Sequence, residues 1–328
     1  MQEDRKTPPS VQKAERDYLL RPFTEITDRD NRELLLAYRL ALRAENASLP
    51  TITHYCGATR DFMLFAEQHE LPGVRETSTV DLRQWIAFMQ DAGAASATIK
   101  NRYVGCRLFF KWLIEEEELT TPNPFDKIKR PKVEVNQKRV VTPEEFKHLF
   151  KHLDAKKRWR DAALIAFLYD TGMRASETCN LPTDNVNLDT GLVRIEASTA
   201  KGKRSRQVRV SPQTLVRLNR YLRHEKDRRK EPEFLFNGTK GALTRSGMLE
   251  VVERCFAEIG LVGGIGVHTL RHSAATAQAG VLSETEMMDI FGWKDADMAR
   301  HYTASARVAV ALAAQERSWP MAALDRRR

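Results

Sequence analysis

The chain has 328 residues, 42% of them hydrophobic, which is typical of a folded globular protein of about two domains. The formal net charge of +9 and a pI near 9.4 favour a polyanionic partner, nucleic acid first, over a merely basic protein. No apolar run approaches the ~20 residues of a membrane span, and Met1–Lys6 lacks a signal core, so we expect a cytoplasmic protein without membrane contact. The four cysteines are scattered and show no Cys-x-x-Cys spacing, which predicts reduced thiols rather than disulfides or zinc ligands.

Residues 28–122 contain four segments with the apolar period of amphipathic helices, and we expect an extended arm over residues 1–27 before them. In the fourth segment, Lys100 and Arg102 put basic groups near a helix N-terminus, where phosphates are favoured. We expect its aromatic residues to fill a core rather than to stack on bases. The pattern predicts a small all-helical domain. The helices should begin near Asp28, Thr51, Thr79 and Ser96.

Residues 123–139 form a basic, proline-containing stretch. A run of charge is often simply solvated. The alternative is an extended linker between two domains that grip one duplex, which would contact the DNA backbone. In that case the contacting residues are Lys127, Lys129, Arg130 and Lys132.

A second domain is expected over residues 140–303. Thr142-Pro143-Glu144-Glu145 has the cap, the first-turn proline and the acidic residue of a helix start. Residues 159–171 are nearly all apolar, so this helix must be buried. After it, Arg174 and Glu177 open the next helix.

Three short segments with a period of two, at residues 186–188, 192–195 and 207–210, predict a small three-stranded antiparallel sheet. The second domain is therefore mixed α/β. The whole chain is predicted to be mainly α with a small antiparallel β-sheet.

The stretch from Gly266 to Tyr302 combines groups that can attack a phosphodiester. His268 and Arg271 are three residues apart and share one helix face. An arginine fork binds phosphate oxygens bidentately, and a tyrosine can hold a covalent phosphoryl group. Trp293 and Tyr302 follow along the chain.

In this order and spacing, the motifs resemble those of the tyrosine recombinases, the phage integrase family. Thr171–Glu177 is similar to the first box of the family, and His268-x-x-Arg271-His272, Gly292-Trp293 and Tyr302 are similar to the second box and nucleophile segment. The four-helix domain resembles the core-binding domain in helix count and position. The resemblance implies a catalytic set of Arg174, Lys201, His268, Arg271, Trp293 and the nucleophile Tyr302.

Two of these positions carry qualifications. Lys201, before the glycine of a basic hairpin, matches the lysine that reaches the active site, while Lys203 and Arg204 are near alternatives and candidate DNA contacts. Trp293 stands where many members have histidine, so it can donate a hydrogen bond but cannot carry a proton. Glu177 is expected to orient a histidine or Arg174 from behind the site, and His272 is assigned a similar supporting role.

The resemblance implies that Tyr302 attacks the scissile phosphate and forms a 3′-phosphotyrosyl link. His268 is the candidate base, and Arg174 and Arg271 neutralise the non-bridging oxygens. Lys201 protonates the leaving 5′ oxygen. The reaction needs no metal, ATP or other cofactor. The expected partner is double-stranded DNA at specific target sites, for integration, excision or resolution, as on mobile genetic elements.

Two rival functions stay open: a type IB topoisomerase that relaxes DNA, and a non-catalytic DNA-binding regulator on the same fold. Strand exchange needs four cleavages, which implies a tetramer on paired sites. Because the expected partner is DNA, we expect the protein to be associated with the nucleoid. Within residues 304–328, the helix expected over Ser305–Glu316 carries a small apolar stripe. It packs either on its own domain or on a neighbouring protomer.

Overall fold

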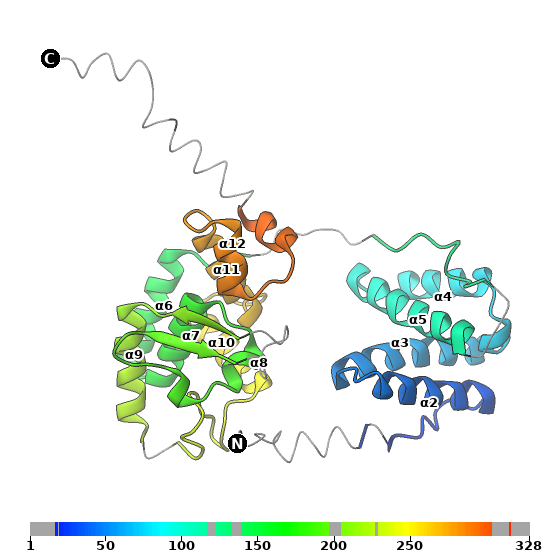
Figure 1. Cartoon of the computed structure of the whole chain (residues 1–328), viewed down its shortest axis with the longest axis horizontal. Coiled ribbons are helices and arrows are strands. Elements are labelled where there is room, and N and C mark those ends of the chain that lie inside the picture. The colour runs from blue at the N-terminus through cyan, green and yellow to red at the C-terminus, as the bar shows by residue number, and fades with distance from the viewer. Residues whose placement is uncertain are drawn as a thin grey trace. The chain divides into compact units, whose positions relative to one another are not determined.

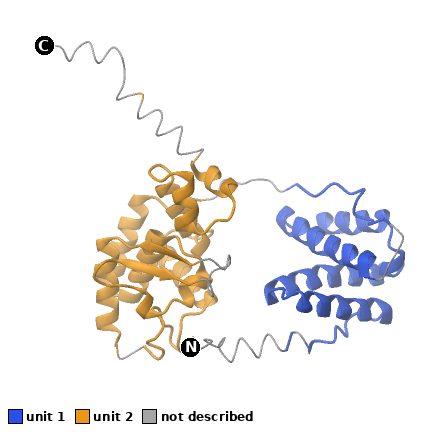
Figure 2. Cartoon of the chain, viewed as in Figure 1, with its two compact units in different colours: residues 1–136 blue, residues 137–328 orange. Residues whose placement is uncertain are grey.

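The computed structural model describes residues 17–18, 20–116, 122–132, 139–196, 205–226, 229–303 and 315. The chain divides into two compact units, residues 1–136 and residues 137–328, which Figure 2 shows in different colours. Each unit has its own buried apolar core. In the described parts of the chain, no helix is long and apolar enough to cross a membrane.

All the secondary-structure elements in the described residues of the first unit are helices (Figure 1). Its helices start close to the predicted positions, although two caps differ. Asp28 caps the first helix as predicted, but Ser48 rather than Thr51 caps the second, because Pro50 occupies its first turn. Ser78 caps the third with a capping box that includes Asp81. The elements are α2 (Arg29–Ala44), α3 (Leu49–Gln68), η1 (Val74–Glu76), α4 (Thr79–Asp91) and α5 (Ser96–Glu116).

The core of this unit contains the aromatic residues of α5, as expected, and it extends beyond the predicted boundaries. Phe23 and Ile26, assigned to an extended arm, are buried in it. Phe125, assigned to the linker, is also buried and meets the Tyr103 ring edge-on at 5.0 Å. Burial of these side chains ties the ends of the helical segment onto the unit, so residues 122–130 pack against α5 rather than extending freely.

The second unit is built around α7, which is buried along its length and contacts α6, α9, α10 and α11. Thr142 and Glu145 form the predicted capping box of α6, and Ser211 caps α9. The elements are α6 (Pro143–Ala155), α7 (Trp159–Thr171), α8 (Ala175–Cys179), η2 (Thr183–Asn185), β1 (Leu192–Ile195), β2 (Arg206–Arg209), α9 (Pro212–His224), α10 (Arg245–Ala257), α11 (Val267–Gln278) and α12 (Glu284–Phe291).

The predicted third strand is wrong as a strand. The sheet has two antiparallel strands, β1 and β2, and Val186 makes only an isolated bridge to Val193. The reason is the turn that follows Val186. The Asn187 side chain accepts hydrogen bonds from the backbone of Asp189 and Thr190, and the Asn187 backbone N–H donates to Leu192. Because this turn begins directly after Val186, residues 187 and 188 belong to the turn and cannot pair with β1 as a third strand.

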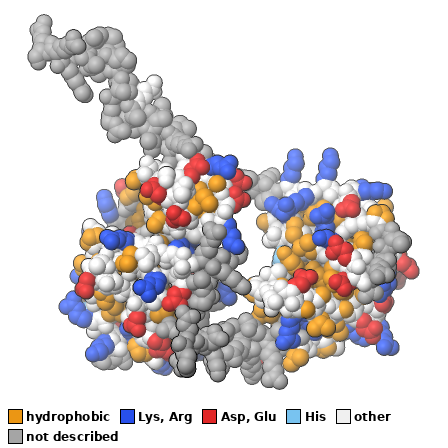
Figure 3. Space-filling view, viewed as in Figure 1, with side chains coloured by type: hydrophobic (Ala, Val, Ile, Leu, Met, Phe, Trp, Pro, Cys, Tyr) orange, Lys and Arg blue, Asp and Glu red, His pale blue; other side chains and the backbone are white. Residues whose placement is uncertain are grey.

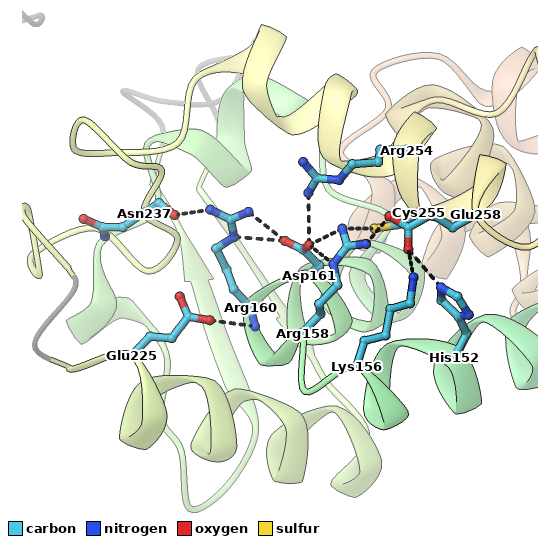
Figure 4. A network of polar contacts seen from close by, with 10 residues as sticks. All are labelled: His152, Lys156, Arg158, Arg160, Asp161, Glu225, Asn237, Arg254, Cys255 and Glu258. Carbon is cyan, nitrogen blue, oxygen red and sulfur yellow. Dashed lines mark hydrogen bonds and ion pairs between the residues drawn. The ribbon is translucent and has the colours of Figure 1, made fainter.

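The two ends of α7 are fixed by different interactions. At its start, Asp161 binds Arg158, Arg160 and Arg254, and Arg158 also pairs with Glu258 of the α10 C-terminus (Figure 4). At its end, Gly172 takes a left-handed conformation with φ of 55°, which favours glycine. A Cβ added to Gly172 would lie 2.3 Å from the Phe291 ring, so α7 and α12 meet closely here.

All four cysteines are buried and free, as predicted.

Candidate active site

Arg174 lies at the N-terminal cap position of α8, directly after the turn that ends α7. Its Nη1 donates to Glu177 Oε1 at 3.0 Å, and its Nη2 donates to the Gly292 carbonyl at 3.2 Å. Its side chain remains 26% exposed. The first box is thereby joined to the segment that precedes Trp293, and part of the Arg174 side chain still faces solvent.

Glu177 is fully buried and binds two arginines. Besides Arg174, it accepts a bidentate pair from Arg206, at 3.0 Å to Oε1 and 2.7 Å to Oε2. Burial acts to raise the pKa of the Glu177 carboxyl, but the hydrogen bonds and charges of Arg206 and Arg174 outweigh it, and the pKa lies below its usual value. Glu177 is therefore a carboxylate bound to Arg174, one of the two partners expected for it.

Arg271 on α11 is buried and makes contacts to both neighbouring segments. Its Nη1 donates to the Gly172 carbonyl at 2.5 Å and its Nη2 to the Phe291 carbonyl at 2.7 Å. Burial, with the charges of Arg174 and Arg206, lowers its pKa to about 10. The lowered pKa means that keeping Arg271 charged in this buried position costs free energy. An anion placed beside the three guanidinium groups reduces that cost, so the cluster favours binding of a phosphate.

The aromatic residues of the site form a stack. The Phe291 and Trp293 rings are 4.9 Å apart, and the Trp293 and Tyr302 rings are 5.3 Å apart and nearly parallel at 4°. The Arg271 guanidinium carbon lies 5.8 Å from the Trp293 ring centre. Trp293 thus packs between Phe291 and Tyr302, the packing part of the role expected for it.

Tyr302 is only 8% exposed, and His272 rather than His268 makes the hydrogen bond to its phenol that the structure shows, with Nδ1 3.0 Å from the oxygen. His268 lies one turn earlier on α11, with its side chain exposed. Burial raises the pKa of Tyr302, while the charge of Arg271 acts to lower it. The supporting histidine is therefore in direct contact with the candidate nucleophile.

Some predicted residues fall outside the part of the chain that the structure describes. These are Lys201, Lys203 and Arg204 of the basic hairpin and almost all of the C-terminal segment, including the helix expected over Ser305–Glu316. Strand β2 begins two residues after the hairpin, at Arg206.

The predicted DNA contacts of the first unit differ in their surroundings. Lys100 is half-buried, and Arg102 is half-buried and pairs with Asp61 at 2.7 Å. Four others are exposed: Lys127, Lys129, Arg130 and Lys132. On the face drawn in Figure 3, Lys and Arg side chains of both units are interspersed with Asp and Glu. DNA contact by these residues stays a prediction.

Arg206 is not among the site residues predicted from the sequence. A signal was present: β2 alternates in burial, and Arg206 shares the inward register with Val208. A basic residue in the inward register of a half-buried strand requires a buried partner, which here is Glu177. No group of three or more His, Cys, Asp or Glu that could hold a metal ion occurs among the residues described.

The structure thus groups guanidinium groups beside a buried tyrosine, an arrangement suited to phosphoryl transfer. Comparison with known proteins agrees. The phage integrase family model matches residues 139–308, and the model described as phage integrase, N-terminal SAM-like domain matches residues 35–117. The chain belongs to the phage integrase family of tyrosine recombinases and is a DNA strand-exchange enzyme.

Relatives and solved structures are consistent with this assignment. Tyrosine recombinase XerC of Bacillus subtilis (strain 168) is 30% identical over 242 residues, covering 71% of this chain and 78% of that protein. Tyrosine recombinase XerD of Chlorobaculum tepidum is 30% identical over 210 residues, covering 61% and 68%.

Among solved structures, XerH site-specific recombinase in a post-cleavage complex with difH substrate has a TM-score of 0.67 at 22% identity, over 92% of each chain. The Tn1549 transposon integrase in complex with a circular intermediate DNA has a TM-score of 0.71 at 19% identity, over 87% of this chain and 99% of that one. These likenesses establish the shared fold.

Proposed function

We propose that this recombinase cleaves DNA by attack of the Tyr302 phenol on a phosphate held by Arg174 and Arg271. The observation that carries the proposal is that Arg174, Arg271 and Tyr302 come together around Gly292 and Trp293, although they are far apart in the sequence. Attack gives a 3′-phosphotyrosyl link and a free 5′-hydroxyl. The two guanidinium groups stabilise the charge that develops on the non-bridging oxygens.

The proton transfers are assigned to two further residues. His268, exposed on α11, is proposed as the base that takes the phenol proton, and Lys201 as the acid that protonates the leaving 5′ oxygen. Tyr302 must exchange its hydrogen bond to His272 for the phosphate before it attacks. His272 is therefore proposed to hold the phenol until DNA is engaged.

A nicked duplex tests the proposal directly. The protein first selects its own site from a randomised duplex library, and that site is then nicked next to the scissile phosphate so that religation fails. We expect a covalent adduct with the wild type and none with Tyr302→Phe. An adduct of equal yield from Tyr302→Phe would remove Tyr302 from the mechanism.

A plasmid carrying two copies of the selected site tests strand exchange against relaxation. Recombinant circles are expected, whereas a ladder of topoisomers alone would indicate a type IB topoisomerase. Adduct formation with neither product would indicate incomplete assembly on the DNA.

We further propose that four protomers assemble on two paired target sites. We also propose that the protein acts in the cytoplasm, at the nucleoid, and that its gene belongs to a mobile genetic element. Four cleavages by one tyrosine each are the physical support for the tetramer. A chain truncated after Thr303 is expected to bind one half-site but to lose cooperative pairing and recombination. Normal recombination by the truncated chain would show that the C-terminal segment has no part in assembly.

A further inference from the structure

Arg206 makes three directed hydrogen bonds from a nearly buried position. Its side chain is 8% exposed. Its two terminal nitrogens bind the two oxygens of Glu177, and its Nε donates to the Ile290 carbonyl at 3.0 Å. One side chain on β2 is therefore bonded both to α8 and to the last turn of α12.

Gly292 connects this contact to Arg174. Gly292 has φ of 62°, and a Cβ placed there would lie 3.0 Å from Arg206 Nη1, so the guanidinium packs against bare backbone. On the same residue, the carbonyl accepts the hydrogen bond from Arg174 Nη2. Arg206 and Arg174 thus both contact Gly292 and both bind Glu177, immediately before Trp293.

We propose that Arg206 is a positioning residue for strand cleavage: by holding Glu177 and the end of α12, it keeps Arg174 directed at the scissile phosphate and keeps Trp293 in place behind Tyr302. The inference rests on the proposed function of Arg174 and Tyr302. In this proposal Arg206 acts through Glu177 and the end of α12, and it does not itself bind the phosphate.

The physical reason is the shared carboxylate. With Arg206 present, the charge of buried Glu177 is divided between two guanidinium groups. Without it, Glu177 keeps Arg174 as its remaining arginine partner, and a buried carboxylate holds such a partner strongly. Arg174 would then be drawn toward Glu177 and away from an incoming phosphate. A lysine cannot replace Arg206, because a single ammonium lacks the fork that binds both oxygens and a third acceptor.

The test compares Arg206→Lys with Arg209→Lys. Arg209 lies on the same strand, is exposed, and makes the matched control because the same side-chain change is introduced there. The probe is the nicked duplex carrying the site that the wild type selects. We expect half-site affinity within about twofold of wild type for both variants, and a single-turnover adduct rate lowered by roughly 10- to 100-fold for Arg206→Lys alone. Thermal melting of both variants confirms that each is folded.

A second substrate separates positioning from a general defect of the fold. Replacing a non-bridging oxygen of the scissile phosphate by methyl removes the charge that Arg174 is proposed to neutralise. The deficit of Arg206→Lys should shrink by about tenfold or more on this methylphosphonate. An equal deficit on both substrates would overturn the inference, as would equal rates for Arg206→Lys and Arg209→Lys, or a loss confined to affinity.

Failure of this inference is distinct from failure of the proposed function. Absence of an adduct from the wild type itself would remove the proposed mechanism. An adduct from the wild type, together with any of the three contrary results above, would leave that mechanism in place and remove Arg206 from it.

Discussion

The Nδ1 atom of His272 lies 3.0 Å from the phenol oxygen of Tyr302, across 30 residues of sequence. The phenol is also stacked on Trp293, so the candidate nucleophile is held on two sides. Burial makes its ionised form less favourable, and the charge of Arg271 offsets only part of that effect. The candidate nucleophile is thus held in its neutral form.

The first prediction concerns this stored phenol. In the free protein, Tyr302 should titrate above its ordinary value of 10, because burial raises its pKa. A group with a raised pKa stabilises the fold fully below its unfolded pKa, and this contribution is lost as the pH rises through the folded pKa. NMR titration of the protein with ring-labelled tyrosine measures the pKa of Tyr302.

His272→Ala should move the titration of Tyr302 down toward 10, because the cavity left by the imidazole admits water to the phenol. His148→Ala is the control, since this exposed histidine of α6 should leave the titration of Tyr302 unchanged. A wild-type Tyr302 that titrates at or below 10 would contradict the stored state.

The second prediction is that Tyr302→Phe folds and binds DNA but forms no adduct. The phenylalanine ring keeps the stack on Trp293, and the lost hydrogen bond to His272 costs about 1 kcal/mol of unfolding free energy. Urea denaturation and the nicked-duplex assay measure the two effects. Tyr169→Phe, a half-buried tyrosine of the same unit, is the control and should keep adduct formation.

The third prediction separates the two arginines. Arg174→Ala and Arg271→Ala should each lose cleavage far more than binding, because both are proposed to act in the transition state. Arg271→Ala should also lower the unfolding free energy by about 1–3 kcal/mol, since it leaves two buried carbonyls without their donor. Because Arg174 is more exposed, Arg174→Ala should lower the unfolding free energy by less than Arg271→Ala. Intact single-turnover cleavage at saturating protein would make either residue one that only binds DNA.

Local sequence signals predicted much of the fold, and motifs in the sequence selected candidate residues for the site. The capping boxes and the apolar run of α7 act within a few residues, so pattern alone locates them. The first box and the second box were recognisable by motif. The structure then brought Arg174, Arg271 and Tyr302 together as the resemblance implied.

The rest depends on contacts between distant segments. Arg206 reaches Glu177 across 29 residues and Ile290 across 84, and no local period encodes such a pairing. His272 was assigned a supporting role, but its direct contact with Tyr302 requires knowing how residues 296–303 fold back onto α11. Residues 186–188 have the alternating pattern of a strand, yet the Asn187 side chain closes a turn that ends their pairing with β1.

The fourth prediction tests the junction of α7 and α12. Gly172→Ala should lower the unfolding free energy by about 2 kcal/mol or more, because it combines left-handed backbone strain with a clash against Phe291. Gly93→Ala is the matched control: it has φ of 73° but no atom near its added Cβ, so it should cost only the backbone strain of about 1 kcal/mol. Equal losses, measured by urea denaturation, would mean that the contact with Phe291 relaxes without cost.

The last prediction concerns the N-terminal end of α7, where Glu258 accepts hydrogen bonds from His152, Lys156 and Arg158 (Figure 4). The hydrogen bond from His152, followed by those from Arg158 and Lys156, lowers the pKa of Glu258 to about 2. A lowered carboxyl pKa stabilises the fold above the unfolded value of 4.5, and this contribution is lost as the pH falls from there through about 2. Glu258→Gln should therefore reduce the unfolding free energy near neutral pH.

Because Glu258 is partly exposed, solvent screening limits this reduction to about 1 kcal/mol. The difference between wild type and Glu258→Gln should narrow as the pH falls below 4.5, and Glu253→Gln, exposed on the same helix, should show no comparable difference at any pH. Denaturation curves across this pH range supply the measurement. A difference that persisted unchanged at the acid end would mean that the glutamine alters packing at α10, and that the charge of Glu258 is not what stabilises this end of α7.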